Sequence, residues 1–539
     1  MLPQVPKELL PDLLRRDHTL TGGILFGLDG YLIELQARAV QLLPRPGTWR
    51  SSVGITGMAR GAISESLDRI SGAFAKYLIP PPQAEILINL APADLPKEGT
   101  WLDLPLAIIM LQASGLLPDL PGSVESNFVL MGELGLHGEL RRVPGVLSMA
   151  YISRPGQKLI VPRGNEMECA LIMAKPGHEG CGVHPAETLD QVLRFFQGQG
   201  KLDNALKKRI TFEPVIGEGV DFARIKGQER AKRAALIAAA GGHNLLLIGP
   251  PGEGKSLLAG AISGILPRLS SEEAVQLTRI YSACGELDRD GLAVTRRPFR
   301  RVHHTASKQS LVGGGSKIPR PGEITLAHLG ILFLDEIAEF SASTLDSLRQ
   351  PIEDGEVHIS RVGASLSYPS RFTLVAAMNP CPCGYFNSDA CRCKPNDVRK
   401  YQKKLSGPIL DRIDLQVELN RLTTEQRFAD SDGEPTSTLQ VRVESARSRQ
   451  VTRFRNSGIA FNSAIPGGHV KDYCSFSPDG FQSYRDVIDR NTLTTRSMDR
   501  LAKVARTVAD LSDSEAVERE HIEDAESFVV GGLLRDAFT

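Results

Sequence analysis

The stretch NLLLIGPPGEGKSLLAGAI, residues 244–262, joins an apolar strand-like run, a glycine-rich loop and an apolar helical run. The loop matches the pattern G-x-x-x-x-G-K-S, whose glycines let backbone N–H groups approach a polyphosphate. The lysine of such a loop reaches the β and γ phosphates, and the serine hydroxyl ligates Mg²⁺. Because a strand precedes the loop and a helix follows it, we expect an ATP site in an α/β fold. Its predicted residues are Gly249, Gly252, Gly254, Lys255 and Ser256.

Two further strand-like runs end in polar residues. GILFLDEI, residues 330–337, contains Asp335, which we expect to bind Mg²⁺, and Glu336, which we expect to polarise the attacking water. FTLVAAMNP, residues 372–380, contains Asn379, whose amide could orient the same water. The simpler alternatives are solvated acids at the end of a strand and a turn residue before proline.

The length and composition indicate an ordinary globular protein. A chain of 539 residues is expected to form two or three domains, and 41% apolar with 23% charged residues is typical of a soluble fold. Apolar runs are too short for a membrane span, and the N-terminus lacks the apolar run of a signal peptide, so we expect no membrane and a cytoplasmic protein. The 63 basic and 63 acidic residues cancel, so overall charge does not indicate a polyanionic partner.

Patterning along the chain predicts its domains. Strand-like runs at residues 84–90, 127–134 and 158–162 accompany a long apolar helical run at 102–117, as in an α/β or α+β module. Strands then alternate with helices, as in a parallel sheet covered on both faces, and helical periodicity follows. The predicted parts are an N-terminal domain at 1–197, a linker at 198–220, an ATPase core at 221–420 and a helical domain at 421–539.

The glycine-rich loop, LFLDE, AAMNPCPCG and SGPILDRIDL together resemble the magnesium-chelatase-like branch of the AAA+ ATPases, and within it the competence protein ComM family. The resemblance extends over nearly the whole chain. It implies ATP and Mg²⁺ as cofactors, Asn379 as sensor 1, and Arg412 as an arginine finger that acts on a neighbouring subunit of a hexameric ring. For an isolated DRID motif, an ion pair of Arg412 with Asp411 or Asp414 would be the alternative.

The stretch TTRSMDRLAKVARTVADL, residues 494–511, resembles the sensor 2 helix of the same family. The resemblance implies that Arg496 touches the γ-phosphate, and Arg500, one turn along, is the second candidate. Either arginine could instead be a surface charge on a helix.

Basic side chains concentrate in three segments. Residues 295–324 carry seven basic residues against one acid, Glu323, and residues 394–404 and 441–455 are also rich in Lys and Arg. Such segments suit contacts with a DNA backbone, although solvated basic loops without a partner are common. The seven basic residues are Arg296, Arg297, Arg300, Arg301, Lys308, Lys317 and Arg320.

Four of the eight cysteines lie in NPCPCGYFNSDACRC, residues 379–393. The two C-x-C pairs could bring four thiolates around one Zn²⁺, although this spacing is tighter than that of common zinc knuckles. Vicinal pairs seldom close disulfides, and the expected compartment is reducing, so free thiols or redox chemistry are the remaining alternatives. The predicted metal ligands are Cys381, Cys383, Cys391 and Cys393.

The N-terminal stretches INLAPADLPKEG, LDLPLAIIMLQASG and MGELGLHGELRRVPGVLSMA resemble the proteolytic domain of Lon-type proteases. That domain needs a Ser–Lys dyad, but the matching positions hold Asp103 and Leu147. Lys97 and Ser114 lie nearby in the sequence, outside the matching places. We therefore expect an inactive, Lon-like α+β domain that serves as a scaffold or a DNA-binding collar.

Taken with the resemblance, the motifs predict a ring-forming, ATP-dependent DNA motor that drives branch migration during recombination of incoming DNA. A chelatase-type ATPase that remodels a protein partner without DNA is the alternative. An ATP-dependent protease is a third possibility, which the missing dyad disfavours.

Overall fold

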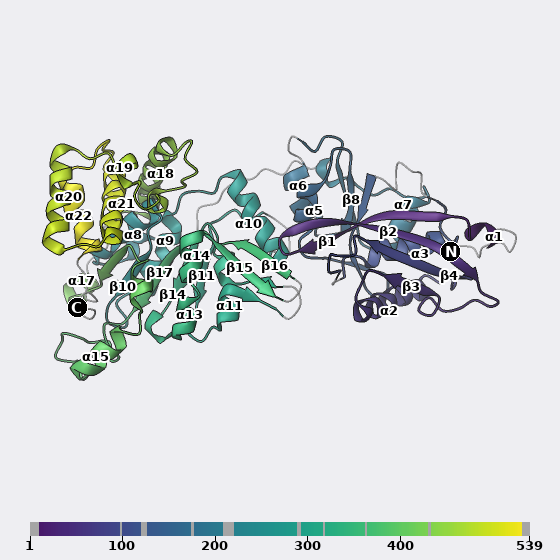
Figure 1. Ribbon diagram of the computed structural model, residues 1–539, viewed down its shortest axis with the longest axis horizontal. Helices are drawn as coiled ribbons and strands as arrows, with labels where there is room; N and C mark the ends of the chain where they lie inside the picture. Colours follow the sequence, from purple (N-terminus) through teal and green to yellow (C-terminus); the bar gives the residue numbers. More distant parts are fainter. Residues whose placement is uncertain are drawn as a thin grey trace. The chain divides into compact units, whose positions relative to one another are not determined.

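The computed structural model describes residues 10–97, 100–119, 127–173, 177–207, 220–287, 293–315, 319–361, 364–428 and 433–530. The chain divides into two compact units (Figure 1). Unit 1 comprises Met1–Phe212 with Ala274–Val294, and unit 2 comprises Glu213–Glu273 with Thr295–Thr539. The predicted domain boundaries stay predictions, and residues 208–219 of the predicted linker lie outside the described residues.

Unit 1 contains a seven-stranded mixed sheet in the order β3-β4-β2-β1-β5-β8-β9. The first two strands pair antiparallel, and β5, β8 and β9 run parallel to one another. Every residue of the helix α3 is buried, which explains its unbroken apolar sequence. The predicted strands at 84–90 and 158–162 are present, and 127–134 is divided between β5 and β6. The strands are β1 (Asp17–Phe26), β2 (Asp29–Leu42), β3 (Val53–Thr56), β4 (Ala84–Ala91), β5 (Phe128–Leu130), β6 (Glu133–Leu134), β7 (Leu140–Arg141), β8 (Lys158–Pro162) and β9 (Gly182–Ala186), and the helices are α1 (Leu10–Leu13), α2 (Arg60–Lys76), α3 (Asp103–Ala113), α5 (Val146–Ile152), α6 (Glu166–Met173) and α7 (Leu189–Phe196).

The helix α10, Ser271–Cys284, comes from the middle of the predicted ATPase core, yet its residues from Ala274 onward belong to unit 1. Arg279 Nη2 lies 2.7 Å from Asp29 Oδ1. The backbone of Ser282 accepts a hydrogen bond from Gly145 N at 3.0 Å, and its hydroxyl donates to the buried Glu168. Unit 1 therefore contains a segment that the sequence pattern did not assign to it.

Unit 2 contains a five-stranded sheet in the order β11-β14-β17-β10-β18, and all its strand pairs are parallel. The residues of β10, β14 and β17 are all buried, as expected for central strands of a parallel sheet, whose two faces are both covered. Ile248 lies opposite Met378, and Leu334 lies opposite Ala376, so the carboxyl ends of these strands share one edge. The strands are β10 (Leu245–Ile248), β11 (Phe299–Val302), β14 (Ile331–Leu334), β17 (Thr373–Met378) and β18 (Leu415–Glu418).

Helices of the C-terminal region form a group at one end of unit 2 (Figure 1). One hydrophobic core continues from the sheet, at Leu245 and Val375, into this group, at Val443 and Leu501. The mixed α/β fold with a parallel sheet and a helical C-terminal region is therefore confirmed. The helices of unit 2 are α8 (Glu229–Gly241), α9 (Lys255–Ile265), α11 (Lys308–Val312), α12 (Glu323–Leu326), α13 (Ala342–Asp346), α14 (Arg349–Asp354), α15 (Pro395–Gln402), α16 (Gly407–Leu410), α17 (Thr424–Phe428), α18 (Thr436–Arg453), α19 (Val470–Tyr473), α20 (Pro478–Asn491), α21 (Thr495–Leu511) and α22 (Arg519–Val529).

Two antiparallel hairpins extend unit 2: β12 (Gly313–Gly314) with β13 (Arg320–Pro321), and β15 (Glu356–Arg361) with β16 (Ala364–Pro369). The buried Tyr368 hydroxyl donates to Pro319 O at 2.5 Å and joins the second hairpin to the first. The two hairpins therefore form one connected element of unit 2.

Candidate active site

The glycine-rich loop runs from the end of β10 to the start of α9. Gly252 and Gly254 have φ values of +83° and +88°, a left-handed conformation that favours glycine. Gly249 is needed for a different reason, since a Cβ there would lie 2.9 Å from the Cβ and the backbone oxygen of Leu419. No side chain caps the N-terminus of α9, so its first N–H groups can bind an anion.

Lys255 is held by oxygen atoms of the loop and of the neighbouring strand. Its Nζ donates to Gly249 O at 2.6 Å, to Pro250 O at 2.8 Å and to Asn379 Oδ1 at 3.0 Å. Burial lowers the pKa of Lys255, and the nearby acids Asp335, Glu253 and Glu336 act against that shift. The ammonium uses all three of its donors here, and the oxygens of a phosphate could replace these acceptors.

Ser256 and Asp335, the two predicted Mg²⁺ ligands, lie within hydrogen-bonding distance of each other. Ser256 Oγ donates to Asp335 Oδ2 at 3.1 Å, and oxygen donors of this kind suit Mg²⁺. The same carboxylate oxygen lies 2.6 Å from Arg301 Nη2. Arg301 belongs to the basic segment that we considered for DNA contacts, with a solvated loop as the alternative. Because β11 lies beside β14 in parallel register, its side chain reaches Asp335 instead. A bound Mg²⁺ would compete with Arg301 for this carboxylate.

Glu336 follows Asp335 in a left-handed conformation, with φ of +53°. A residue other than glycine pays about 1–3 kcal/mol for such a backbone, and these conformations cluster at functional sites. Its side chain is 52% exposed, and its Oε2 lies 3.1 Å from His304 Nδ1, at an angle that does not make a hydrogen bond. His304 lies in the basic segment 295–324, and its closeness to Glu336 was not predicted.

Arg412 lies outside the glycine-rich loop, in a separate cluster of charges. Its Nη2 lies 2.6 Å from Glu353 Oε1, and it also donates to Arg349 O at 3.1 Å and Pro408 O at 2.7 Å. Its side chain is only 9% exposed. The predicted alternative, an ion pair with Asp411 or Asp414, is wrong, because Glu353 takes that place.

The two sensor 2 candidates differ in their surroundings. Arg496 is 61% exposed and lies 3.0 Å from Glu353 Oε1 and 3.8 Å from Asp411 Oδ2, so it belongs to the Arg412 cluster. Arg500 donates to Ile413 O at 2.7 Å and thereby supports the chain just after Arg412. Among the contacts of the described residues, neither arginine is joined to the glycine-rich loop. The role of Arg496 therefore stays a prediction.

The four predicted metal ligands converge. Their sulfur atoms lie within 4.8 Å of one another, with Cys381 3.4 Å from Cys383 and Cys383 3.7 Å from Cys391. Four thiolates at about 2.3 Å from one Zn²⁺ would be about 3.8 Å apart, so the donor set fits this ion. Backbone N–H groups of Tyr385 and Arg392 lower the pKa of Cys383 to about 6, and all eight cysteines are free of disulfides.

The basic segments differ in how far their side chains are free to meet a partner. Arg297 and Arg300 form ion pairs with Glu273 and Glu323, and Lys317 lies outside the described residues. Four of the five arginines in residues 441–455 are likewise held inside unit 2. Arg442, Arg449 and Arg453 form ion pairs with Glu434, Asp513 and Asp510, respectively, and Arg447 donates a hydrogen bond to Ala239 O.

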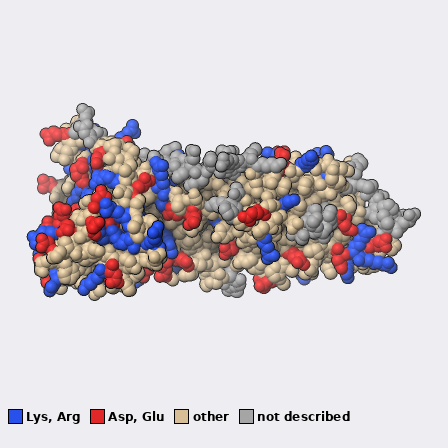
Figure 2. Space-filling model, turned by 90° about the horizontal axis from the view of Figure 1, so that it is seen from above, with Lys and Arg blue, Asp and Glu red and all other residues tan. Residues whose placement is uncertain are grey.

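By contrast, α15 and the residues beside it carry exposed basic side chains, and among these described residues Lys404 alone forms an ion pair, with Glu339 at 3.0 Å. Figure 2 shows basic and acidic side chains intermixed over unit 2, so this face has no uninterrupted basic field. The basic side chains of α15 are therefore more accessible to a partner than most of those in residues 441–455. The exposed basic residues of α15, with those flanking it, are Lys394, Arg399, Lys400, Lys403 and Lys404.

Unit 1 has no dyad at the positions matched to a Lon-type protease. Asp103 is buried at the start of α3, where Arg69 Nε contacts its carboxylate at 2.6 Å, and Leu147 is fully buried. Lys97 donates to Pro92 O and Leu95 O, and Ser114 donates to Leu111 O, so both have local structural partners. The Lon-like character of this unit stays a prediction.

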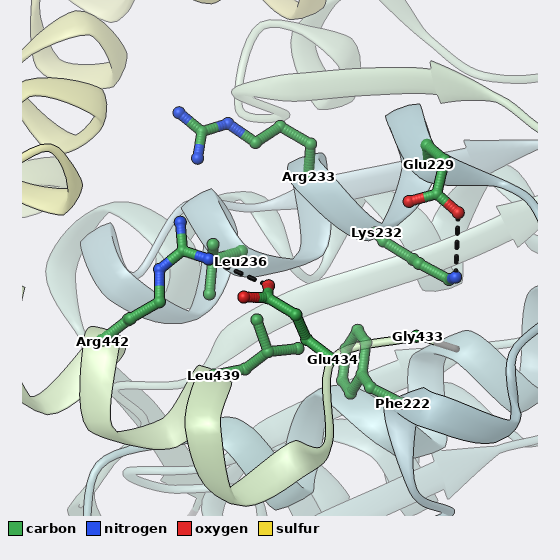
Figure 3. Close-up of a pocket in the computed structure, with 9 residues that line it drawn as sticks. All are labelled: Phe222, Glu229, Lys232, Arg233, Leu236, Gly433, Glu434, Leu439 and Arg442. Atoms are coloured by element: carbon green, nitrogen blue, oxygen red, sulfur yellow. Dashed lines mark hydrogen bonds and ion pairs between the residues drawn. The ribbon is translucent and has the colours of Figure 1, made fainter. Parts of the chain in front are cut away.

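A cavity of about 270 Å³ lies between α8 and the start of α18 (Figure 3). Its charged lining is already paired, with Lys232 3.1 Å from Glu229 and Arg442 3.0 Å from Glu434. A ligand would have to break these pairs, so we assign none. Within the described residues, every helix is too short or too polar to cross a bilayer.

The chain matches three family models: magnesium chelatase subunit ChlI at residues 221–427, subunit ChlI of Mg-chelatase at 47–165, and the ChlI C-terminal model at 433–528. YifB of Salmonella typhimurium is 41% identical over 479 residues, covering 88% of this chain and 90% of that protein. Rv2897c of Mycobacterium tuberculosis is 38% identical over 512 residues, covering 94% of this chain and 98% of that protein. Competence protein ComM of Haemophilus influenzae is 38% identical over 477 residues, covering 87% of this chain and 90% of that protein. The chain therefore belongs to the magnesium-chelatase-like ComM family of AAA+ proteins.

Proposed function

We propose that the protein hydrolyses ATP with Mg²⁺ at the carboxyl edge of the unit 2 sheet. The observation that carries this proposal is the pair of contacts that links Lys255 to Asn379 and Ser256 to Asp335. Lys255 would bind the β and γ phosphates, while Ser256 and Asp335 would hold Mg²⁺, which neutralises the developing charge. Glu336 would polarise the attacking water, and Asn379 would orient it.

Arg412 would act on the nucleotide of a neighbouring subunit in a ring, which the family resemblance implies to be hexameric. Two observations support this: Arg412 is joined to Glu353 rather than to its own glycine-rich loop, and Arg496 shares that carboxylate. Both arginines would then approach the same neighbouring phosphate, with Arg496 in the sensor 2 role. Glu353 has to release them first.

The proposed work of the ring is translocation on DNA that drives branch migration during recombination of incoming DNA. The relative named competence protein ComM and the exposed basic residues of α15 support this proposal. Cysteines that form no disulfide suit a cytoplasmic location, and we infer a structural Zn²⁺ at the four that converge. The family models for magnesium chelatase favour, as the second candidate, an ATPase that remodels a protein partner without DNA.

The test is the ATPase rate of the purified protein with no DNA, with single-stranded or duplex DNA, and with branched DNA. We expect a several-fold stimulation by branched DNA, which Glu336→Gln abolishes and which Glu425→Gln, at an exposed acid of α17, leaves intact. Movement of a labelled branch point would then establish the motor. A turnover that is indifferent to every DNA would favour the protein-remodelling alternative, and an absence of turnover would remove both.

A further inference from the structure

The four-cysteine segment lies directly against the nucleotide site. Pro380 alone separates Cys381 from Asn379, whose Oδ1 accepts the hydrogen bond from Lys255. Gly384, with φ of +85°, approaches so closely that a Cβ there would lie 2.6 Å from Pro251 Cδ and 3.8 Å from Asn379 Cγ. The turn that holds the first cysteine pair therefore touches both the glycine-rich loop and the predicted sensor 1.

The second cysteine pair connects this turn to α15. Lys394 follows Cys393, and α15 begins at the next residue. At the end of that helix the buried Gln402 donates from Nε2 to Pro380 O at 3.0 Å. The chain thus leaves Pro380, passes the four cysteines and α15, and returns to Pro380, which makes a closed loop beside Asn379.

Within this loop, residues 381–393 contain turns but neither helix nor strand. Their backbone–backbone hydrogen bonds are local ones, namely Gly384 N to Cys381 O and Cys391 N to Ser388 O, with one more in the turn between. Contact between the two cysteine pairs passes through the thiol groups, such as Cys383 and Cys391 at 3.7 Å. Four metal–thiolate bonds would replace these weak contacts with a firm cross-link.

We propose that a metal ion held by the four thiolates controls the affinity of the neighbouring nucleotide site. The ion holds the Gly384 turn against Pro251 and keeps Asn379 within reach of Lys255. Its loss frees the turn, so that ATP has to order this edge of the sheet when it binds. The proposal rests on the metal binding and the ATP site proposed above, and it adds that the two bindings are coupled.

Coupling between two sites is reciprocal, so ATP must tighten metal binding by the same factor by which the metal tightens ATP binding. The full-length protein is loaded with Zn²⁺, stripped with a chelator in the presence of a thiol reductant, and then reloaded. The Kd of a fluorescent ATP analogue is measured at each stage. We expect stripping to weaken binding by about 10-fold and reloading to restore it.

The reciprocal measurement starts from loaded protein and therefore does not depend on the fold of the stripped form. Transfer of Zn²⁺ to a chromogenic chelator is followed with and without ATP. We expect ATP to lower the apparent Kd for Zn²⁺ by about the same 10-fold factor. Equal transfer with and without saturating ATP would overturn the coupling.

Variants separate the metal from the turn. The double change Cys391→Ser with Cys393→Ser removes two ligands, and we expect it to bind ATP as weakly as stripped protein, regardless of Zn²⁺. Gly384→Ala keeps all four thiols but places a methyl group against Pro251. It should still give the absorption bands of Co²⁺ bound by four thiolates, while its ATP affinity no longer responds to metal. Cys284→Ser, outside the cluster, is the matched control.

The outcomes distinguish the coupling from what it rests on. Stoichiometric Zn²⁺ with equal ATP affinity in loaded and stripped protein would overturn the coupling and leave the metal site standing. No stoichiometric metal would overturn the metal site and the coupling together. Loaded protein that binds no ATP analogue would contradict the proposed nucleotide site itself.

Discussion

The proposed ATP site and the Arg412 cluster each contain a basic side chain that would bind phosphate, Lys255 and Arg412, respectively. The two side chains have different partners. Lys255 is bound by three neutral oxygens, two of them backbone carbonyls. Arg412 is bound by two carbonyls and also by the Glu353 carboxylate. Arg412 and Glu353 carry opposite charges, so they have a Coulomb attraction that the neutral oxygens around Lys255 do not supply. The Lys255 side can therefore accept a triphosphate readily, whereas the Arg412 side has to give up an ion pair.

Arg412→Ala gives the largest expected effect. If Arg412 acts on a neighbour, its loss lowers turnover by about 10³–10⁵-fold, since it removes charge stabilisation that is needed in the transition state. The Kd of ATP should change little, because Lys255 and the glycine-rich loop remain. Steady-state turnover and equilibrium binding of an ATP analogue measure the two quantities.

Mixing two inactive variants decides whether the finger acts within or between subunits. Subunits with Arg412→Ala keep a complete glycine-rich loop, and subunits with Lys255→Ala keep a complete finger. Mixed assemblies would contain complete sites at some of their interfaces and regain part of the activity. A mixture as inactive as its components would place Arg412 outside the neighbour's site.

His328 lies before β14, at the opposite end of the strand from Asp335. It belongs neither to the nucleotide site nor to the Arg412 cluster. Burial beside Arg371 and Arg297 lowers its pKa to about 4. The unfolded chain takes up this proton near pH 6.5 and the folded chain only near 4, so stability falls as the pH drops through that window. By pH 5 the loss is about 2 kcal/mol, and denaturant unfolding at pH 7 and pH 5 measures it.

His328→Asn should reduce this acid-side loss while keeping an acceptor for Arg371 N. The exposed His358→Asn is the control and should leave the pH dependence as it is. If His328→Asn leaves the slope between pH 7 and pH 5 unchanged, other groups cause the loss. If His328→Asn changes the pH dependence of the free energy of unfolding but keeps normal ATP affinity at pH 7, then His328 affects the stability of the fold and not the nucleotide site.

The exposed α15 and the internally paired α18 allow the same comparison for DNA. Replacing Arg399 and Lys400 by Ala should weaken DNA binding by about 10-fold at moderate salt and reduce the salt slope by about 2. The matched control is Arg442→Ala with Arg449→Ala, at sites already paired with acids. This double variant should change DNA binding and its salt slope little. Titrations of labelled branched DNA at several salt concentrations test both pairs. Equal losses from the two pairs would contradict the assignment of α15.

Glu353→Gln gives the smallest expected change. An amide keeps hydrogen bonds to Arg412 and Arg496 but removes the negative charge, so both arginines leave it more easily. We expect turnover to rise about 3-fold, equivalent to about 0.7 kcal/mol, with Asp354→Asn as the neighbouring control. A fall in turnover would instead show that Glu353 positions the finger for the reaction.

Local motifs made much of unit 2 predictable. The runs before Gly249, Asp335 and Asn379 are apolar throughout because their strands are buried on both faces. Since carboxyl ends of parallel strands share an edge, the contacts of Lys255 with Asn379 and of Ser256 with Asp335 follow from the motifs. The convergence of the four cysteines likewise follows from their short spacing.

Partners contributed by distant segments were not predictable from the same patterns. The sequence around an arginine does not show whether its side chain contacts DNA or an acid of the same protein. Arg301 contacts Asp335. Glu353 stands in an ordinary polar helix, and nothing in its own surroundings indicates Arg412. The apolar side of α10 shows that the helix is buried, but its pattern does not show in which unit.

The assignment of Ala274–Val294 to unit 1 has a practical consequence for dissecting the protein. Three chain crossings join the units, at residues 212–213, 273–274 and 294–295, so unit 1 cannot be removed by a single cut. A fragment that begins at residue 213 would still carry Arg279 and Ser282 without Asp29 and Glu168. A truncated ATPase meant to fold alone would need a short designed bridge from Glu273 to Thr295.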